Sequence, residues 1–166
     1  MLFYIMSSIK FNPETGDITP IDSKYKGLYG GLPFVRKILS HNLNGKDKSR
    51  QNIEIEIVTK IKENKKNNLV DVYDIQEPTD KKNGYIDMEL LQTFVNEIDY
   101  KLNEKNILFL NKLEGDVKRG LEQLHSLCIV YIDLHIGNVG WSIKDECWKI
   151  FDFNMSGILE IDSQKE

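Results

Sequence analysis

The sequence predicts an α+β fold with a strand-rich first half and a helical second half. Up to Leu91, short apolar stretches bounded by turn residues surround a single helical pattern. After Leu91, a long amphipathic pattern precedes a loop and a hairpin. A chain of 166 residues suits one domain or two small lobes, and we expect lobes at residues 1–91 and 92–166.

Composition narrows the class of protein. Hydrophobic residues make up 40% and charged residues 29%, as in a soluble globular domain, and the net charge of −4 argues against nucleic-acid or membrane partners. Cys128 and Cys147 fit no metal-ligand spacing, so we interpret them as reduced core thiols of a cytoplasmic protein. The chain is rich in Lys, Asn and Ile and lacks Ala, which is compatible with an AT-rich genome, as in a virus or parasite.

Turn signals and periodicity predict the elements of the first half. Strand patterns occur at residues 1–6, 8–21 (a hairpin around N-P-E-T-G-D), 34–39, 69–75 and 85–91. A helix is expected over residues 50–63, capped by Asp47 or Ser49, because Ile57, Val58 and Ile61 recur at helical spacing.

Two helices and a hairpin are expected in the second half. Residues 92–102 read as a short helix, and residues 107–127 as a long amphipathic helix. Strands at 139–142 and 148–151 enclose the turn K-D-E and form the hairpin.

Three oxygen-bearing side chains have the spacing of a phosphoryl-transfer site. Asp133 follows a buried-strand-like run, where a carboxylate is costly unless it leaves the core or is paired, and it could act as a general base. Asn138 and Asp152 offer the hard oxygen ligands that Mg²⁺ prefers. Asp133 alone is better explained as a turn residue, but the three in register favour the functional interpretation.

Histidines add one candidate. His135 lies two residues after Asp133 and could donate a hydrogen bond to a phosphate. A zinc site is disfavoured, because His41 and His125 are distant in sequence and no cysteine cluster assists them.

A buried ion pair is also suggested. Lys37 alternates with Arg36 on the strand at 34–39, so one of the two points inward and needs an anionic partner. Glu54 can supply it from the apolar face of the helix, whereas Glu56 falls off that face. Two solvated charges explain the same pattern equally well.

Glycines precede that strand. Gly27, Gly30 and Gly31 could let backbone amides approach a phosphate. Their spacing, G-x-x-G-G, departs from G-x-G-x-x-G, and a flexible turn is an equal explanation.

Two stretches resemble the protein kinase superfamily. L-E-Q-L-H-S-L-C-I-V-Y-I-D-L-H-I-G-N-V, at 121–139, resembles the large helix running into the catalytic loop H-R-D-L-x-x-x-N, and K-I-F-D-F-N, at 149–154, resembles D-F-G. The resemblance implies that Asp133 is the catalytic aspartate, that Asn138 and Asp152 bind Mg²⁺, and that ATP is the phosphoryl donor. It implies a minimal bilobal kinase-like fold, with an antiparallel sheet and one helix in the first lobe.

The first lobe takes further roles from this resemblance. Lys37 falls on the strand lysine and Glu54 on the helix glutamate that pairs with it. Glu89 and Leu91 are expected to offer backbone groups to adenine, with Met88 at the gatekeeper position.

Several positions depart from the family pattern. Tyr131 and Ile132 replace the usual His and Arg, so a phosphorylated activation loop lacks that cation. His135 replaces Lys, and D-L-H-x-G-N also resembles the loops of aminoglycoside phosphotransferases and UbiB-like proteins. Asn154 replaces Gly, a mild change because Asn tolerates left-handed backbone.

Only 12 of the 166 residues follow Asn154, so we expect a reduced second lobe. A homodimer or partner protein could cover its apolar faces, with Val117, Leu121 and Leu124 as candidates, although the same residues could pack internally. The expected function is ATP-dependent phosphotransfer to a hydroxyl, of protein Ser/Thr or of a small molecule. The alternatives are a pseudokinase or kinase mimic that modulates a partner without turnover, and an unrelated α+β domain.

Overall fold

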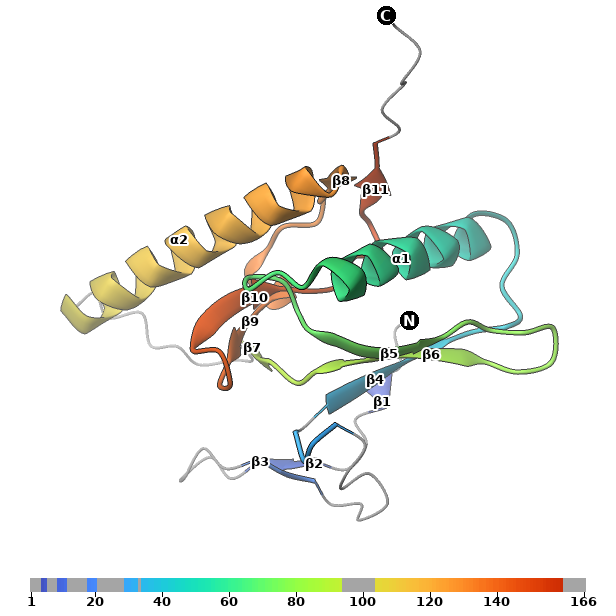
Figure 1. Ribbon diagram of the computed structural model, residues 1–166, viewed down its shortest axis with the longest axis horizontal. Helices are drawn as coiled ribbons and strands as arrows, with labels where there is room; N and C mark the ends of the chain where they lie inside the picture. The colour runs from blue at the N-terminus through green and yellow to red at the C-terminus, as the bar shows by residue number, and fades with distance from the viewer. Residues whose placement is uncertain are drawn as a thin grey trace, which may run out of the picture. The chain divides into compact units, whose positions relative to one another are not determined.

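The computed structural model describes residues 4–5, 9–11, 18–20, 29–32, 34–93 and 104–159 of the chain. Two helices and several small antiparallel sheets confirm the α+β class (Figure 1). Contacts divide the chain into a first unit, Met1–Leu43 with Val72–Leu90, and a second unit, Asn44–Asp71 with Leu91–Glu166. The chain passes between the units after Leu43, after Asp71 and after Leu90, and the segment Asn44–Asp71 belongs to the second unit.

The first unit is built on a four-stranded antiparallel sheet in the order β1-β4-β6-β5 (Figure 1). Its strands are β1 (Tyr4–Ile5), β4 (Phe34–Leu39), β5 (Val72–Gln76) and β6 (Gly84–Glu89). Strands β2 (Ile9–Phe11) and β3 (Ile18–Pro20) form the hairpin predicted at 8–21.

The two faces of this sheet differ in chemistry. Lys37 lies opposite Ile86, and Arg36 lies opposite Asp87, so alternation puts the two cations on opposite faces. Lys37 is buried. On the other face, Nε and Nη2 of Arg36 each donate to an oxygen of the Asp87 carboxylate at 2.6 Å. Tyr29 also donates to Asp87, at 2.6 Å, and burial together with this bond raises the pKa of Tyr29.

Helix α1 (Gly45–Asn64) opens the second unit and begins five residues earlier than the predicted start at 50. The capping prediction was wrong. Asn44 is the N-cap and makes no side-chain cap bond, and the Ser49 hydroxyl donates to the Gly45 carbonyl at 3.2 Å. The predicted apolar face is confirmed, because Glu54, Ile57 and Val58 are all buried.

Strands β7 (Gln92–Thr93), β9 (Val139–Ser142) and β10 (Cys147–Ile150) form an antiparallel sheet in the order β10-β9-β7. The predicted hairpin is confirmed. The short helix expected at 92–102 was wrong at its start, because pairing with β9 takes the backbone groups of Gln92–Thr93 into a sheet. Residues 94–102 lie outside the described residues.

The loop after α1 also pairs with this sheet. Val70 donates to the Ile150 carbonyl, and Ile150 donates to the Asn68 carbonyl, both at 3.0 Å. Leu69 therefore forms a parallel bridge with Ile150, and the strand predicted from residue 69 begins only at Val72.

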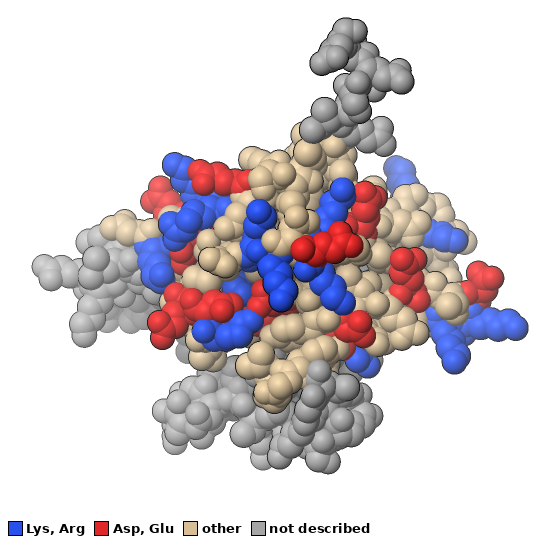
Figure 2. All heavy atoms as spheres, viewed as in Figure 1, with Lys and Arg blue, Asp and Glu red and all other residues tan. Residues whose placement is uncertain are grey.

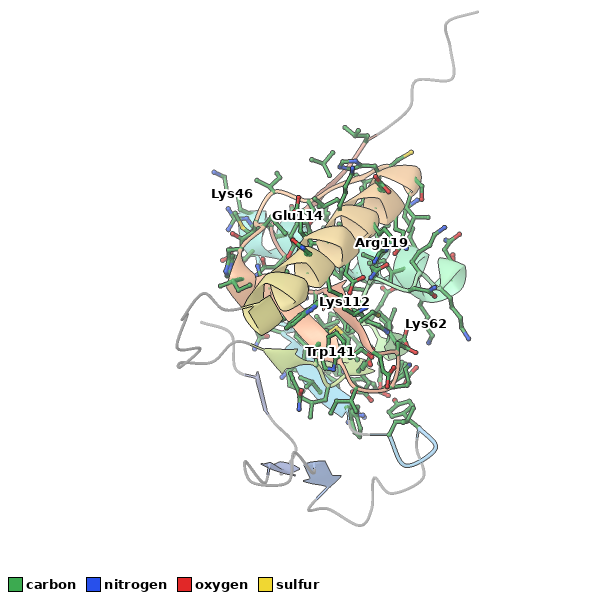
Figure 3. The ribbon with its side chains drawn as sticks, turned by 90° about the vertical axis from the view of Figure 1, so that its left-hand side faces the viewer. Lys46, Lys62, Lys112, Glu114, Arg119 and Trp141 are labelled. Atoms are coloured by element: carbon green, nitrogen blue, oxygen red, sulfur yellow. The ribbon has the colours of Figure 1, made fainter. Side chains whose placement is uncertain are left out.

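Helix α2 (Glu104–Ser126) matches the helix predicted at 107–127 and packs against β10. The buried Asp116 carboxylate accepts the backbone N–H of Trp148 at 2.9 Å and is paired with Arg119. On the same helix, Lys112 lies 5.8 Å from the centroid of the Trp141 ring (Figure 3). Within the described residues, neither helix combines the length and apolarity needed to cross a bilayer.

A cluster of charged side chains surrounds the buried Lys149 at the β9–β10 hairpin. Lys149 is 1% exposed, and its ammonium binds the carboxylate of Asp145, with Asp71 at 3.5 Å. Lys144 is paired with both acids. Burial raises the pKa of Asp145, but the hydrogen bond from Lys149 and the charges of both lysines outweigh it, so the pKa lies below its ordinary value.

Charged side chains of both signs are interspersed over the face drawn in Figure 2, with no large region of a single sign. Cys128 and Cys147 carry thiols, as predicted, but both are half-buried and not core residues. The Cys147 thiol lies 3.3 Å from the Asn67 carbonyl.

Candidate functional site

Asp133 and Asn138 lie in the loop that follows strand β8 (Ile129–Val130). The Asn138 amide nitrogen donates to the Asp133 backbone carbonyl at 3.0 Å and to its carboxylate Oδ2 at 3.2 Å. Asn138 is 6% exposed, whereas the Asp133 side chain is 48% exposed. The asparagine side chain is therefore buried, and the Asp133 carboxylate to which it donates remains accessible to a solute.

The amide orientation of Asn138 determines what it can bind. Both contacts with Asp133 use Nδ2, which carries the only two donor hydrogens of the side chain. Within the described residues, no hydrogen bond reaches Oδ1 of Asn138. This oxygen is the end that could coordinate a hard cation such as Mg²⁺.

His135 shapes the turn between these residues. Its Nδ1 accepts the backbone N–H of Gly137 at 3.1 Å and caps the 3₁₀ turn η2 (Ile136–Asn138). An accepting Nδ1 places the proton of a neutral ring on Nε2, which lies 3.7 Å from Asp133 Oδ2. A Cβ at Gly137 would come within 2.8 Å of the imidazole carbon Cε1, so a side chain at this position would displace the exposed His135 ring.

Asp152 follows β10 and has an unusual backbone. Its φ of 59° lies in the left-handed region, which Asp enters more readily than most residues. The preceding residue, Phe151, donates its N–H to the Asn138 carbonyl at 3.1 Å. Asn138 thus contacts Asp133 through its side chain and the residue before Asp152 through its backbone carbonyl. The role of Asp152 as a third member of the site stays a prediction.

Tyr131 is a site residue that sequence reasoning missed. Its hydroxyl donates to the Phe151 carbonyl at 2.6 Å, and its ring meets that of Phe153 edge to face, with centroids 5.7 Å apart. Tyr131 is 9% exposed and Phe153 is 1% exposed. The sequence identified Tyr131 only as a replacement for histidine and carried no signal for a bond to a backbone carbonyl.

Two orphan polar atoms follow Asp152. The buried side-chain oxygens Oδ1 of Asn154 and Oγ of Ser156 have no hydrogen-bond partner among the described residues. Buried waters commonly satisfy such groups. They lie in the segment between Asp152 and strand β11 (Gly157–Ile158), which pairs with β8.

Exposed apolar side chains flank the loops. Ile132 is 69% exposed, Leu134 45% and Ile136 46%, and Met155 and Leu159 are exposed after Asp152. Of the candidates on α2 for a covered apolar face, Leu124 is fully buried, and Val117 and Leu121 are half-buried.

The other predicted site residues lie outside the loops that carry Asp133, Asn138 and Asp152. Lys37 and Glu54 are 6% and 5% exposed, but they lie in different units, so their pairing stays a prediction. Gly30 and Gly31 adopt left-handed φ of 65° and 78° in an exposed turn, and Gly27 lies outside the described residues.

The expected adenine-binding segment spans the last passage between the units. Glu89 and Leu91 are 6% and 9% exposed, and Met88 is 7% exposed. The first unit ends at Leu90 and the second resumes at Leu91. The roles given to these backbone groups stay predictions.

Neither the models of known protein families nor the curated proteins match this sequence. The kinase resemblance therefore rests on the residues of the two loops.

Proposed function

We propose that this chain is an ATP-dependent phosphotransferase with a minimal kinase-like bilobal fold, which transfers the γ-phosphate of ATP to a hydroxyl acceptor. The proposal is carried by one observation. Asn138 donates to Asp133 and, through its backbone carbonyl, accepts from the residue before Asp152. The proposed base and one proposed oxygen ligand are thereby hydrogen-bonded to each other, and the second proposed ligand follows in sequence the residue that donates to Asn138.

Asp133 is the general base of this proposal. Its accessible carboxylate would accept the proton of the acceptor hydroxyl as the hydroxyl oxygen bonds to the γ-phosphorus. The bond between the γ-phosphorus and the β–γ bridging oxygen breaks, and ADP leaves with the electron pair. The bonds from Asn138 orient the carboxylate before the acceptor arrives, which is a contribution by positioning.

Asn138 Oδ1 and the Asp152 carboxylate fit the oxygen-ligand preference of Mg²⁺ and would hold it. When bound, the ion neutralises charge on the phosphates. His135 presents its Nε2 side toward Asp133, where an N–H donor suits a phosphate oxygen. Lys37, supported by Glu54, is proposed to contact the α- and β-phosphates, as the family resemblance implies.

The proposal is tested with γ-labelled ATP and Mg²⁺, with a generic protein substrate and with a panel of small-molecule alcohols. Asp133→Asn should lower label transfer about 10²- to 10⁴-fold, because it removes the base while keeping the shape of the side chain. Asp80→Asn, at an exposed turn in the first unit, is the matched control and should retain full transfer.

Thermal denaturation with Mg–ATP distinguishes an active phosphotransferase from a pseudokinase and from a domain that binds no nucleotide. Stabilisation by nucleotide without any transfer would support a pseudokinase that binds without turnover. An absence of both transfer and stabilisation would refute the proposal. Equal transfer by the wild type and Asp133→Asn would remove Asp133 from the mechanism.

A further inference from the structure

We propose that the acceptor hydroxyl belongs to a serine or threonine that lies between aliphatic residues of a peptide, and that Ile132, Leu134 and Ile136 bind those aliphatic neighbours. The inference rests on the proposed function, because it names the class of acceptor for the same site. It assigns acceptor specificity to three side chains that have no part in the chemistry of phosphoryl transfer.

The three aliphatic side chains belong to the loop of the proposed base. Ile132 and Leu134 are the chain neighbours of Asp133, and Ile136 follows it by three residues. Their exposed fractions are 69%, 45% and 46%, although side chains of this kind are usually buried. Neighbouring exposed apolar side chains commonly mark a surface that binds a partner. An acceptor that brings its hydroxyl to the Asp133 carboxylate therefore also meets aliphatic surface.

Polar contacts hold this loop in shape without the three aliphatic side chains. The Asn138 amide donates to the Asp133 backbone carbonyl at 3.0 Å, and Nδ1 of His135 accepts the Gly137 N–H at 3.1 Å. Substitutions of exposed side chains outside such contacts usually change stability little. The aliphatic side chains can therefore be replaced to test recognition while the loop keeps its hydrogen bonds.

The charges of the two loop segments favour an uncharged acceptor. Residues 129–142 and 150–159 contain two acids, Asp133 and Asp152, and neither a lysine nor an arginine. An acceptor with flanking Asp or Glu would therefore meet only like charge in these segments. A polycationic acceptor, such as an aminoglycoside, needs several carboxylates, whereas the proposed function assigns both acids to the base and the metal. Aliphatic neighbours of the hydroxyl carry neither cost.

The order of exposed residues fits a peptide better than a lipid alcohol. Asp133 and His135 alternate with the aliphatic residues along the chain, and their side chains are 48% and 55% exposed. A lipid chain or a membrane surface needs continuous apolar area, which these polar groups interrupt. A peptide meets both kinds of group, because its side chains supply apolar contacts and its backbone supplies hydrogen-bonding groups.

Acceptor preference is measured with four peptides that differ only beside a single serine. The flanking residues are leucine and isoleucine in the first peptide, glutamate in the second, lysine in the third and glycine in the fourth. With γ-labelled ATP and Mg²⁺, we expect kcat/KM for the aliphatic peptide to exceed that for the other three, and that for an aminoglycoside, by about tenfold or more. Aliphatic contacts discriminate between substrates to that degree.

Variants test whether the named side chains bind the acceptor. The double substitution Ile132→Ser with Leu134→Ser should lower kcat/KM for the aliphatic peptide about tenfold and leave that for the glycine peptide nearly unchanged. Ile143→Ser is the matched control and should keep the preference, because Ile143 is 51% exposed but lies in the turn of the β9–β10 hairpin. If the double variant does not fold, Ile136→Ser takes its place with a loss in the same direction.

A binding assay separates this inference from the proposed function. A fluorescent aliphatic peptide with alanine in place of serine is titrated with protein and a non-hydrolysable ATP analogue, and its anisotropy gives the Kd. If the wild type transfers no phosphate but the double variant raises this Kd about tenfold, the phosphotransferase is refuted and the peptide surface is retained.

Three results would overturn the inference itself. The first is an equal Kd for the wild type and the double variant. The second is transfer to a charged peptide or an aminoglycoside at least as efficient as transfer to the aliphatic peptide. The third is a wild-type dimer that the double variant dissociates in light scattering, because a second copy of the chain then covers these side chains.

Discussion

Gly120 allows α2 to approach the β10 sheet, and its replacement by alanine should destabilise the protein although alanine favours helices. A Cβ at residue 120 would lie 2.9 Å from the Asn68 carbonyl oxygen and 2.9 Å from Cδ1 of Ile150. Both distances are shorter than real Cβ contacts. Because Ile150 is fully buried, the new methyl group has no solvent-facing direction in which to move.

The Asn68 carbonyl cannot retreat at low cost. It accepts the Ile150 N–H at 3.0 Å, while Asn68 donates its own N–H to Gln123 at 3.1 Å and its side-chain amide to the Trp148 carbonyl at 3.0 Å. Overpacking of this kind costs about 1–3 kcal/mol. Alanine in place of glycine in a helix returns about 1 kcal/mol. We therefore expect Gly120→Ala to lower the free energy of unfolding by about 1 kcal/mol.

Gly115 provides the control on the same helix. A Cβ there would approach only the Arg119 guanidinium, at 3.5 Å, and that side chain is half exposed and able to move. Gly115→Ala should stabilise the protein by about 0.5–1 kcal/mol through helix propensity alone.

Urea denaturation followed by circular dichroism measures both variants, and thermal melts should show shifts of opposite sign of about 2–4 °C per kcal/mol. Equal stabilisation by both substitutions would refute the close approach of α2 to Asn68 and Ile150.

Two further predictions concern acids that pair with cations, the buried Asp116 and the exposed Asp145. Asp116→Ala should lower the free energy of unfolding by about 2 kcal/mol, because the Trp148 N–H becomes a buried donor without an acceptor. Asp116→Asn keeps an acceptor and should lower it less, as measured by urea denaturation. Equal losses in the two variants would show that the Trp148 N–H is not what Asp116 stabilises. Asp145→Asn should destabilise the protein at pH 7, because it removes the anion that Lys149 binds. The pKa of Asp145 is lowered in the folded state, so its contribution is present above the ordinary value of 3.8 and is lost as pH falls through the folded pKa. The difference in unfolding free energy between the wild type and Asp145→Asn should therefore narrow as the pH falls below 3.8, and a difference that stays constant with pH would contradict the ion pair.

Sequence patterns predicted correctly the elements that form through contacts between residues close in sequence. The period of apolar residues located α2, and the turn residues at 144–146 located the β9–β10 hairpin. Strand β7 was missed because two residues form it only by pairing with β9, which is remote in sequence. The strand expected from residue 69 was shifted for the same reason, since Leu69 pairs with Ile150.

The candidate site was predictable in composition but not in its contacts. Spacing alone brought out Asp133 and Asn138, and the structure joins them by direct hydrogen bonds. The bond from Tyr131 to the Phe151 carbonyl leaves no periodic or compositional mark, because any residue in that place supplies the same acceptor. The capping of α1 was mispredicted because Asn44 and Gly45 start the helix before its apolar pattern begins.

The parallel bridge between Leu69 and Ile150 bears on how the chain acquires its structure. The N-terminal partner emerges from the ribosome long before the C-terminal one, so the loop after α1 must wait for β10 before its carbonyls and amides are satisfied. Contacts between residues so distant in sequence close large loops and therefore slow folding. Cleaving the chain near residue 91 would separate α1, on the N-terminal fragment, from the rest of the second unit, on the C-terminal fragment. The second unit should therefore fold only when the two fragments are mixed.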